Sequence, residues 1–317
     1  MTAPSIDQRT PVLVGAGQVV QHAAGIDDAL DPAALMAEAA RLAAGDAGLS
    51  SVPGVDSVRV IGLLSWRYGD PAAVVARYLG LSPRQTAVTP MGGNGPQSLV
   101  NTTAAQIADG SLDTALLVGG ECTRTRQRAR RAGVELAWPT APEGRVPDVL
   151  GDDLAMSHPV EQAHGGYLPV QVYPMFETAL RAAAGRSPTQ HLALISDLWS
   201  RFSAVAADNP FAWNHTARTA DEIATPSPAN RMIGLPYTKY MNSNNDVDMS
   251  AALLMCSAAT ATSLGVPRDR WVFPQSGTDC HEHHFISHRW AFDRTPAIEL
   301  GGRMALELAG TGLDDVD

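Results

Sequence analysis

The chain has 317 residues, 45% of them hydrophobic and 18% charged, which is the composition of a globular protein with one or two domains. No apolar run approaches 18 residues and residues 1–10 lack an apolar segment, so we expect neither a membrane span nor a secretion signal. The net charge of −10 disfavours nucleic acid as a partner. The three cysteines, Cys122, Cys256 and Cys280, lie far apart in the sequence, which predicts free thiols and a cytoplasmic location.

Strand-like and helix-like segments alternate over the first 121 residues. Residues 11–20 have the continuous apolar run of a strand buried in a parallel sheet. Asp31 and Pro32 then predict the start of a helix that stops near Gly45 or Gly48. The other elements expected here are strands at 58–64, 85–90 and 114–118 and helices at 70–79 and 95–108. This alternation predicts an α/β fold with a mainly parallel sheet covered by helices.

The pattern changes between residues 122 and 242, where proline, glycine and polar residues are frequent. Two amphipathic helices are expected in this region, at about 174–185 and 187–208. We interpret the region as an insertion on the sheet, a place where ligand contacts are often found. After it, strands are expected at 250–257 and 271–275, and helices at 258–265 and 297–309.

A glycine-rich turn, formed by Gly92, Gly93, Asn94 and Gly95, lies between the third predicted strand and the helix that follows. The first turn of a helix presents unpaired backbone N–H groups and the positive end of the helix dipole, which suit an oxyanion, a thioester carbonyl or a phosphate. These four residues are therefore candidate ligand contacts. The alternative is that the glycines only form a tight connection between strand and helix.

Four segments keep a fixed order along the chain: PVLVGAGQVV at 11–20, the strand–turn–helix at 85–108, LLVGGE at 116–121 and NDVDMSAALLMCS at 245–257. Together they resemble the thiolase superfamily, most of all bacterial thiolase-like proteins and sterol-carrier-type thiolases, often labelled acetyl-CoA acetyltransferases. The helical segments around 173–177 and 187–207 resemble the coenzyme-A-binding loop domain of that superfamily.

The resemblance implies a thiolase-like architecture. A βαβαβαββ half-domain would be formed by residues 1–121 and 243–264, with the helical loop domain inserted at 122–242. Residues 265–317 would form the beginning of an incomplete second half, because the family's catalytic His and second Cys motif are not found in this sequence.

The resemblance also indicates what stands at the position of the family's nucleophile. In thiolases a cysteine lies three residues before a glycine that matches Gly95, so Gly92 occupies the cysteine position. A thiolate at this helix terminus would attack the acyl thioester, whereas glycine has no side chain that could react. Neither Cys122 nor Cys256 replaces it by a local shift in sequence. We therefore expect no acyl-enzyme at this position, and we expect the chain alone to be inactive.

The loop at 236–245 leads into the last buried strand of the half-domain. The resemblance implies that its polar residues Lys239, Asn242 and Asn244 contact coenzyme A. The alternative is a solvated lysine beside turn-forming asparagines. Asp248 matches an acidic position of the family, and we expect it to be structural. An acyl-CoA thioester would be the substrate or ligand, and no other cofactor is implied.

Two further clusters of charged or titratable residues have simpler explanations. The arginines at 124, 126, 128, 130 and 131 either lie on a solvated helix face or attract the phosphates of coenzyme A. Cys280 is followed by histidines at 281, 283, 284 and 288, but their spacing matches neither HExxH nor a CxxC pair. We expect a loop near the sheet edge there and no metal.

The sequence therefore predicts an acyl-CoA-handling protein of the acyltransferase class, with a role in lipid metabolism. The alternatives are a non-catalytic CoA-thioester-binding subunit and a cysteine-free retro-aldolase subunit that acts with a partner. Small residues along the helix at 95–108 predict that a further layer covers it, so a second polypeptide could supply the missing half. The resemblance also implies a homodimer through the strand at 85–90.

Overall fold

The computed structural model describes residues 6–316, which divide into two compact units. Within these residues, the first unit contains 6–153, 245–278 and 305–316. The second unit contains 154–244 and 279–304. The predicted domains, 1–121 with 243–264, 122–242 and 265–317, have other boundaries and stay a prediction. Among residues 6–316, no helix combines the length and the apolar character that crossing a bilayer requires.

A six-stranded mixed sheet forms the centre of the first unit, in the order β1-β8-β4-β2-β3-β5. β8 pairs in antiparallel fashion with β1 and β4, whereas β2, β3, β4 and β5 pair in parallel. Only β8 of these six strands therefore runs against the others, which confirms the predicted α/β fold with a mainly parallel sheet. The strands are β1 (Pro11–Val20), β2 (Ser57–Val60), β3 (Gln85–Val88), β4 (Thr114–Cys122), β5 (Asp148–Val149) and β8 (Asp248–Ser257).

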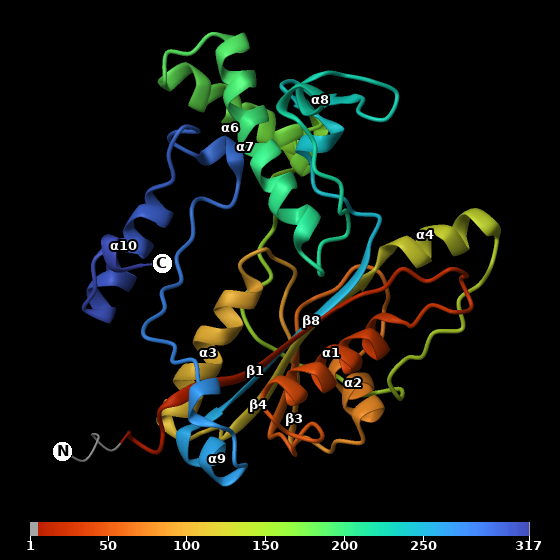
Figure 1. Ribbon diagram of the computed structural model, residues 1–317, viewed down its shortest axis with the longest axis vertical. Coiled ribbons are helices and arrows are strands. Elements are labelled where there is room, and N and C mark those ends of the chain that lie inside the picture. The colour runs from red at the N-terminus through yellow and green to blue at the C-terminus, as the bar shows by residue number, and fades with distance from the viewer. Residues whose placement is uncertain (1–5, 317) are drawn as a thin grey trace. The chain divides into compact units, whose positions relative to one another are not determined.

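Helices cover both faces of this sheet, and Figure 1 shows α3 on the side opposite α1 and α2. α1 (Pro32–Asp46) and α2 (Pro71–Leu79) pack on one face, around buried side chains such as Val58 and Leu254. α3 (Gly95–Asp109) packs on the other face through Leu99 and Ile107. Both faces of the central strands are thus buried, as their continuous apolar runs require.

The capping signals in the sequence have the expected structural effect. Asp31 accepts hydrogen bonds from the backbone N–H groups of Ala33 and Ala34, and Pro32 occupies the first helical position of α1. Asp70 caps α2 in the same manner by accepting from the N–H of Ala73 at 2.9 Å. These carboxylates satisfy N–H groups that have no partner inside the helix and favour its positive end.

β1 and α1 approach each other more closely than any side chain on the strand would permit. A Cβ atom added to Gly15 would lie 2.0 Å from the carbonyl oxygen of Ala43, and one added to Gly17 would lie 2.1 Å from that of Ala39. The two glycines of the PVLVGAGQVV segment therefore allow direct contact between strand and helix backbones.

Several predicted element boundaries are wrong. Residues 271–275 form no strand but a single bridge between Val272 and Leu13, because Pro274 cannot extend the ladder. β5 is absent from the prediction, since a two-residue strand leaves no periodic signal. The remaining elements are α4 (Thr123–Ala132), α9 (Ala258–Ser263), α10 (Pro296–Ala309), η2 (Arg268–Arg270), η3 (Ile286–His288) and η4 (Leu313–Asp315).

The second unit is mainly helical and has a small core of its own around Ile195, Ile223 and Met241. Both expected helices are present, although α6 begins earlier than predicted. Ser187 caps α7 by accepting from the N–H of Gln190 at 3.2 Å. The elements are α5 (Pro159–Ala163), α6 (Pro169–Ala183), α7 (Pro188–Asp208), α8 (Ala220–Ala224), the hairpin of β6 (Met232–Gly234) and β7 (Tyr237–Thr238), and η1 (Lys239–Met241).

Candidate functional site

The glycine-rich turn connects β3 to the N-terminus of α3 in the first unit. Gly92 is half-buried, Gly93 and Asn94 are exposed, and Gly95 is buried. Asn94 stands at the N-cap position but makes no capping hydrogen bond with its side chain. The turn is closed instead by the N–H of Gly95, which donates to the carbonyl oxygen of Gly92 at 3.0 Å. The helix terminus thus carries no side-chain cap at the place where a ligand oxygen is expected.

Position 92 has room for a side chain. A Cβ atom added there would meet only the Oδ1 atom of Asn94, at 2.8 Å, and that atom is the end of a movable side chain. No left-handed backbone angle is found at Gly92. Packing therefore does not require glycine at this position, in contrast to Gly15 on β1.

A shallow apolar hollow of about 130 Å³ lies beside the first turn of α3. Ile61, Leu117 and Leu253 line it from the sheet, and Pro96 and Leu99 line it from the helix. Further along α3, Thr102 and Ala105 are exposed. The helix is therefore buried against the sheet on one side only, although its small residues suit close packing on a second side.

A pocket of about 460 Å³ in the second unit brings together the three predicted loop residues, Lys239, Asn242 and Asn244. Asn242 is held by a hydrogen bond from Nδ2 to the carbonyl oxygen of Thr238, at 2.8 Å. Gly92 to Gly95 belong to the first unit, so the predicted contacts fall into two groups, one in each unit.

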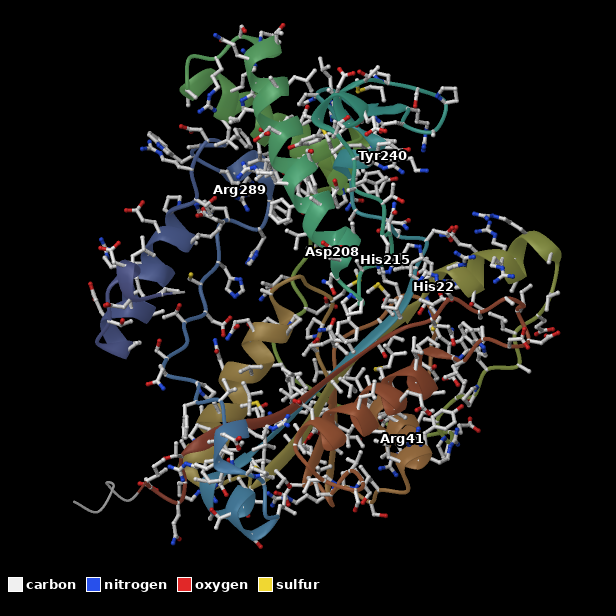
Figure 2. The ribbon with its side chains drawn as sticks, in the orientation of Figure 1. His22, Arg41, Asp208, His215, Tyr240 and Arg289 are labelled. Atoms are coloured by element: carbon white, nitrogen blue, oxygen red, sulfur yellow. The ribbon has the colours of Figure 1, made fainter. Side chains whose placement is uncertain are left out.

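Sequence reasoning missed three other residues of the pocket in the second unit, Trp213, Arg231 and Tyr240. The ring of Tyr240, labelled in Figure 2, lies 4.0 Å from the guanidinium carbon of Arg218. Aromatic rings beside cations suit a ligand that has both a planar base and phosphates. The sequence did contain a signal for this pocket, since Trp213 and Arg231 lie in the loops before and after α8.

Three solved structures resemble this chain over nearly its whole length. A monomeric SCP2-thiolase-like protein of type 1 from Mycobacterium smegmatis is 30% identical to it, with a TM-score of 0.79 over 98% of this chain. The chain has a thiolase-like fold. It spans 60% of the length of that mycobacterial protein.

Two further structures have the same thiolase-like fold at lower identity. The Ltp2-ChsH2(DUF35) aldolase is 18% identical, with a TM-score of 0.67 over 97% of this chain and 72% of that one. An acetyl-CoA acetyltransferase from Syntrophomonas wolfei is also 18% identical, with a TM-score of 0.61 over 98% of this chain and 78% of that one. At this identity the likeness supports the fold alone. No protein-family model and no curated protein sequence match the chain.

The cysteines within the thiolase-like sheet are not reactive groups. Cys122 and Cys256 are both buried and free. Burial raises the pKa of Cys256 to about 12, and burial followed by the nearby carboxylate of Asp248 raises that of Cys122. Because the thiolate is the nucleophilic form, neither of these buried thiols is a nucleophile at neutral pH. Cys280 is exposed and belongs to the second unit.

Asp248 has a structural role in this fold. Its carboxylate accepts from the backbone N–H of Thr125 at 3.1 Å and from the hydroxyl of the same residue at 2.6 Å. Asp248 and Thr125 are both buried, and Thr125 lies in the first turn of α4. The carboxylate therefore connects the first turn of α4 to the first residue of β8.

We expect Asp248→Ala to lower the free energy of unfolding by about 1–3 kcal/mol, because two buried donors of Thr125 lose their acceptor. Asp248→Asn keeps one acceptor oxygen, so its free energy of unfolding should fall less. Chemical denaturation of the two variants measures both effects. Equal stability of Asp248→Ala and the wild type would contradict the structural role.

The basic and histidine-rich clusters also have defined surroundings. On α4, Arg128 donates to the carbonyl oxygens of Ala23 and Ala24, and Arg126 donates to that of Leu64. These two arginines therefore connect α4 to neighbouring loops and are not simply solvated.

In the second unit the ring centres of His281 and His284 are 6.0 Å apart. The guanidinium carbon of Arg289, a residue labelled in Figure 2, lies 5.3 Å from the ring centre of Phe176. No cluster of metal-ligating side chains is found in the part of the chain that the structure describes.

Proposed function

We propose that the chain binds an acyl-CoA thioester and handles it without forming an acyl-enzyme at position 92. The observation that carries this proposal is Gly92 in the turn before α3 of a thiolase-like fold, three residues ahead of the first helical residue, where the chain has backbone N–H groups but no reactive side chain. The acetyl-CoA acetyltransferase among the structural neighbours supports the class of ligand.

In this mechanism the backbone at 92–95 acts on the carbonyl oxygen of the thioester. N–H groups and the helix dipole polarise the C=O bond and stabilise negative charge that develops on its oxygen. A thiolate would convert that polarised carbonyl into a covalent intermediate. Without one, transfer by a two-step covalent route has no nucleophile, and the turn serves binding or a reaction of the bound thioester itself.

A retro-aldolase subunit is the second candidate function. Cleavage of a carbon–carbon bond beside a CoA thioester leaves negative charge on the same carbonyl oxygen, so the turn would stabilise this reaction without a cysteine. This reaction is a candidate because one protein of the same fold is the Ltp2-ChsH2(DUF35) aldolase. A partner polypeptide would then supply the proton-transfer groups.

Taken by itself, the pocket in the second unit is proposed to bind coenzyme A. Arg231 and Lys239 provide positive charge for phosphates, and Trp213 and Tyr240 provide aromatic surface for the adenine base. Asn242 and Asn244 offer amide groups to pantetheine.

Calorimetric titration with acetyl-CoA and with free coenzyme A tests this assignment. Lys239 is the chain's only lysine, and we expect Lys239→Ala to weaken the binding of both ligands about tenfold, as expected for one lost charge-assisted contact. Arg201→Ala on α7 is the matched control, because that side chain pairs with Asp197 and does not line the pocket. Loss of binding in both variants, or in neither, would contradict the role of Lys239.

The open side of α3 supports the proposal that a second thiolase-like half or a separate polypeptide covers it. The apolar hollow at Pro96 and Leu99 is the part of this surface that such a partner would bury.

A homodimer through β3 stays a prediction. β5 already pairs with the outer edge of β3 at Ala87 and Val88, so this dimer would have to displace β5 or use only the rest of the edge. Light scattering of the purified chain measures its oligomeric state.

A further inference from the structure

A buried guanidinium without a carboxylate partner lies far from the glycine turn. Arg59 lies in β2, and all four residues of this strand are buried. Only 1% of the surface of Arg59 is exposed. Its four hydrogen bonds go to neutral oxygens: Oγ of Ser57 at 3.1 Å, Oγ1 of Thr103 at 2.8 Å, Oε1 of Gln85 at 3.4 Å and Oε1 of Gln106 at 2.5 Å. Within residues 6–316 Arg59 forms no salt bridge.

Burial of an unpaired charge is unfavourable unless other groups compensate it. Desolvation lowers the pKa of Arg59 to about 10, so the guanidinium still carries its charge at neutral pH. The negative end of α3 is nearby, and Arg9 donates to the carbonyl oxygen of Ile107 in its last turn. Beyond the helix, Arg9 also donates to the carbonyl oxygen of Leu112 at 2.6 Å, and Arg84 donates to that of Ser111 at 2.7 Å. The hydrogen bonds of Arg59 itself all go to side-chain oxygens, so no carbonyl group of α3 is its direct partner.

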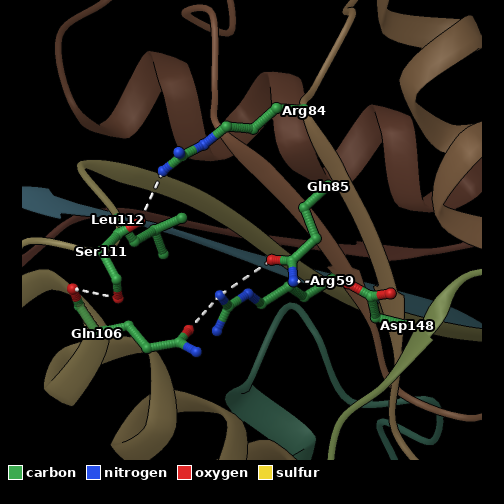
Figure 3. A pocket seen from close by; sticks show the side chains of 7 residues that line it. All are labelled: Arg59, Arg84, Gln85, Gln106, Ser111, Leu112 and Asp148. Carbon is green, nitrogen blue, oxygen red and sulfur yellow. Dashed lines mark hydrogen bonds between the residues drawn. The ribbon is translucent and has the colours of Figure 1, made fainter.

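Arg59 lines a cavity of about 400 Å³, a size within the range of small-molecule sites. Figure 3 shows the side chains of Arg59 and Gln106 on one side of this space, with Arg84 and Ser111 on another and Asp148 beside Gln85. The cavity lining contains the guanidinium groups of Arg59 and Arg84 and the carboxylate of Asp148. Arg84 also pairs with Asp56, with Nε 3.4 Å from Oδ1, so Arg59 is the lining cation that has no carboxylate partner among the described residues.

Asp148 does not neutralise Arg59 directly. Its Oδ2 atom accepts from Nε2 of Gln85 at 2.8 Å, and the same amide's oxygen faces Arg59. One neutral side chain therefore separates the two charges. The amides of Gln85 and Gln106 both turn their oxygens to Arg59, so the guanidinium is held in a fixed orientation at the cavity wall.

We propose that this cavity is a binding site for a small oxyanion, a carboxylate or a phosphate group, held by Arg59 and Arg84. The site is independent of the proposed acyl-CoA function. Ser57 and Gln85 begin their strands, whereas the glycine turn follows the end of β3. Gln106 is 11 residues beyond Gly95 on α3, or about 16 Å along the helix axis at 1.5 Å per residue. Four of the five N–H groups of Arg59 already donate to neutral oxygens, so the anion would accept from its remaining Nη1 N–H group and from Arg84.

Calorimetric titration of the full chain with inorganic phosphate and, separately, with acetate tests the proposal. We expect at least one ion to bind, and the tighter ion identifies the ligand as a phosphate or a carboxylate. Arg59→Gln should weaken that binding at least tenfold, and Arg84→Gln should weaken it less. Arg77→Gln is the control, because Arg77 is exposed on α2 and does not line the cavity. Failure of both ions to bind, or equal binding by Arg59→Gln, would overturn the proposal.

Asp148→Asn keeps the proposal testable if Arg59→Gln does not fold. Asp148 is exposed on β5, and asparagine retains an oxygen that can accept from Gln85. Removal of this negative charge from the cavity should tighten anion binding several-fold at low salt. Unchanged or weaker binding would overturn the proposal, while acetyl-CoA binding, measured on the same variant, should stay at the wild-type level.

Discussion

Gly92→Cys should become acylated by acetyl-CoA, whereas the wild-type chain should not. The introduced thiol would stand at the N-terminus of α3, where the helix dipole lowers the pKa of a cysteine from about 8.5 toward neutrality. Its thiolate would attack the thioester carbonyl, and the thiol of coenzyme A would leave. The acetyl group would then be held as a thioester on the introduced cysteine. Intact-protein mass spectrometry detects the added acetyl group.

The matched control for this experiment is Gly93→Cys. Position 93 is exposed and open, since an added Cβ atom would meet nothing within 4 Å. Both variants are made with Cys280→Ser, which removes the exposed native thiol. We expect acylation at position 92 to be about 100-fold faster than at 93, because only the first thiol is placed against a bound carbonyl. Equal rates, or no adduct at 92, would contradict the assignment of Gly92 to the nucleophile position.

The sequence alone predicts the fold well where hydrophobic burial determines it. β1, β4 and β8 have long apolar runs, and each was predicted close to its observed position. β5 was missed because its two residues are defined by pairing with the edge of β3, a tertiary contact that leaves no local pattern. The predicted strand at 271–275 was wrong because pairing with β1 stops after one bridge, at Val272.

The candidate sites follow the same division. The glycine turn was recognisable because a short run of glycines between a predicted strand and a predicted helix is visible in the sequence itself, although neither a left-handed φ nor backbone packing requires glycine at 92, 93 or 95. The contribution of Arg231 and Trp213 to the pocket in the second unit depends on how separate loops fold together, which a single sequence does not reveal. Arg59 did leave a signal, because an arginine inside the short buried run SVRV requires polar partners. The partners of its guanidinium come from β3 and α3, which are distant in sequence, so the sequence does not show which oxygens surround it.

Gly15→Ala should destabilise the chain strongly. The new methyl group would lie 2.0 Å from the carbonyl oxygen of Ala43, which is backbone and cannot rotate away, so α1 would have to move off β1. We expect a loss of about 3 kcal/mol in the free energy of unfolding, or a fall of roughly 6–12 °C in Tm.

Gly45→Ala is the control variant, because Gly45 is exposed in α1 and an added Cβ atom there meets nothing within 4 Å. Its alanine should stabilise the helix by about 0.5–1 kcal/mol. Both variants add one methyl group. If Gly15→Ala lowers the free energy of unfolding and Gly45→Ala raises it, the loss is due to the contact between strand and helix. Similar stability in both would mean that β1 and α1 are not in backbone contact.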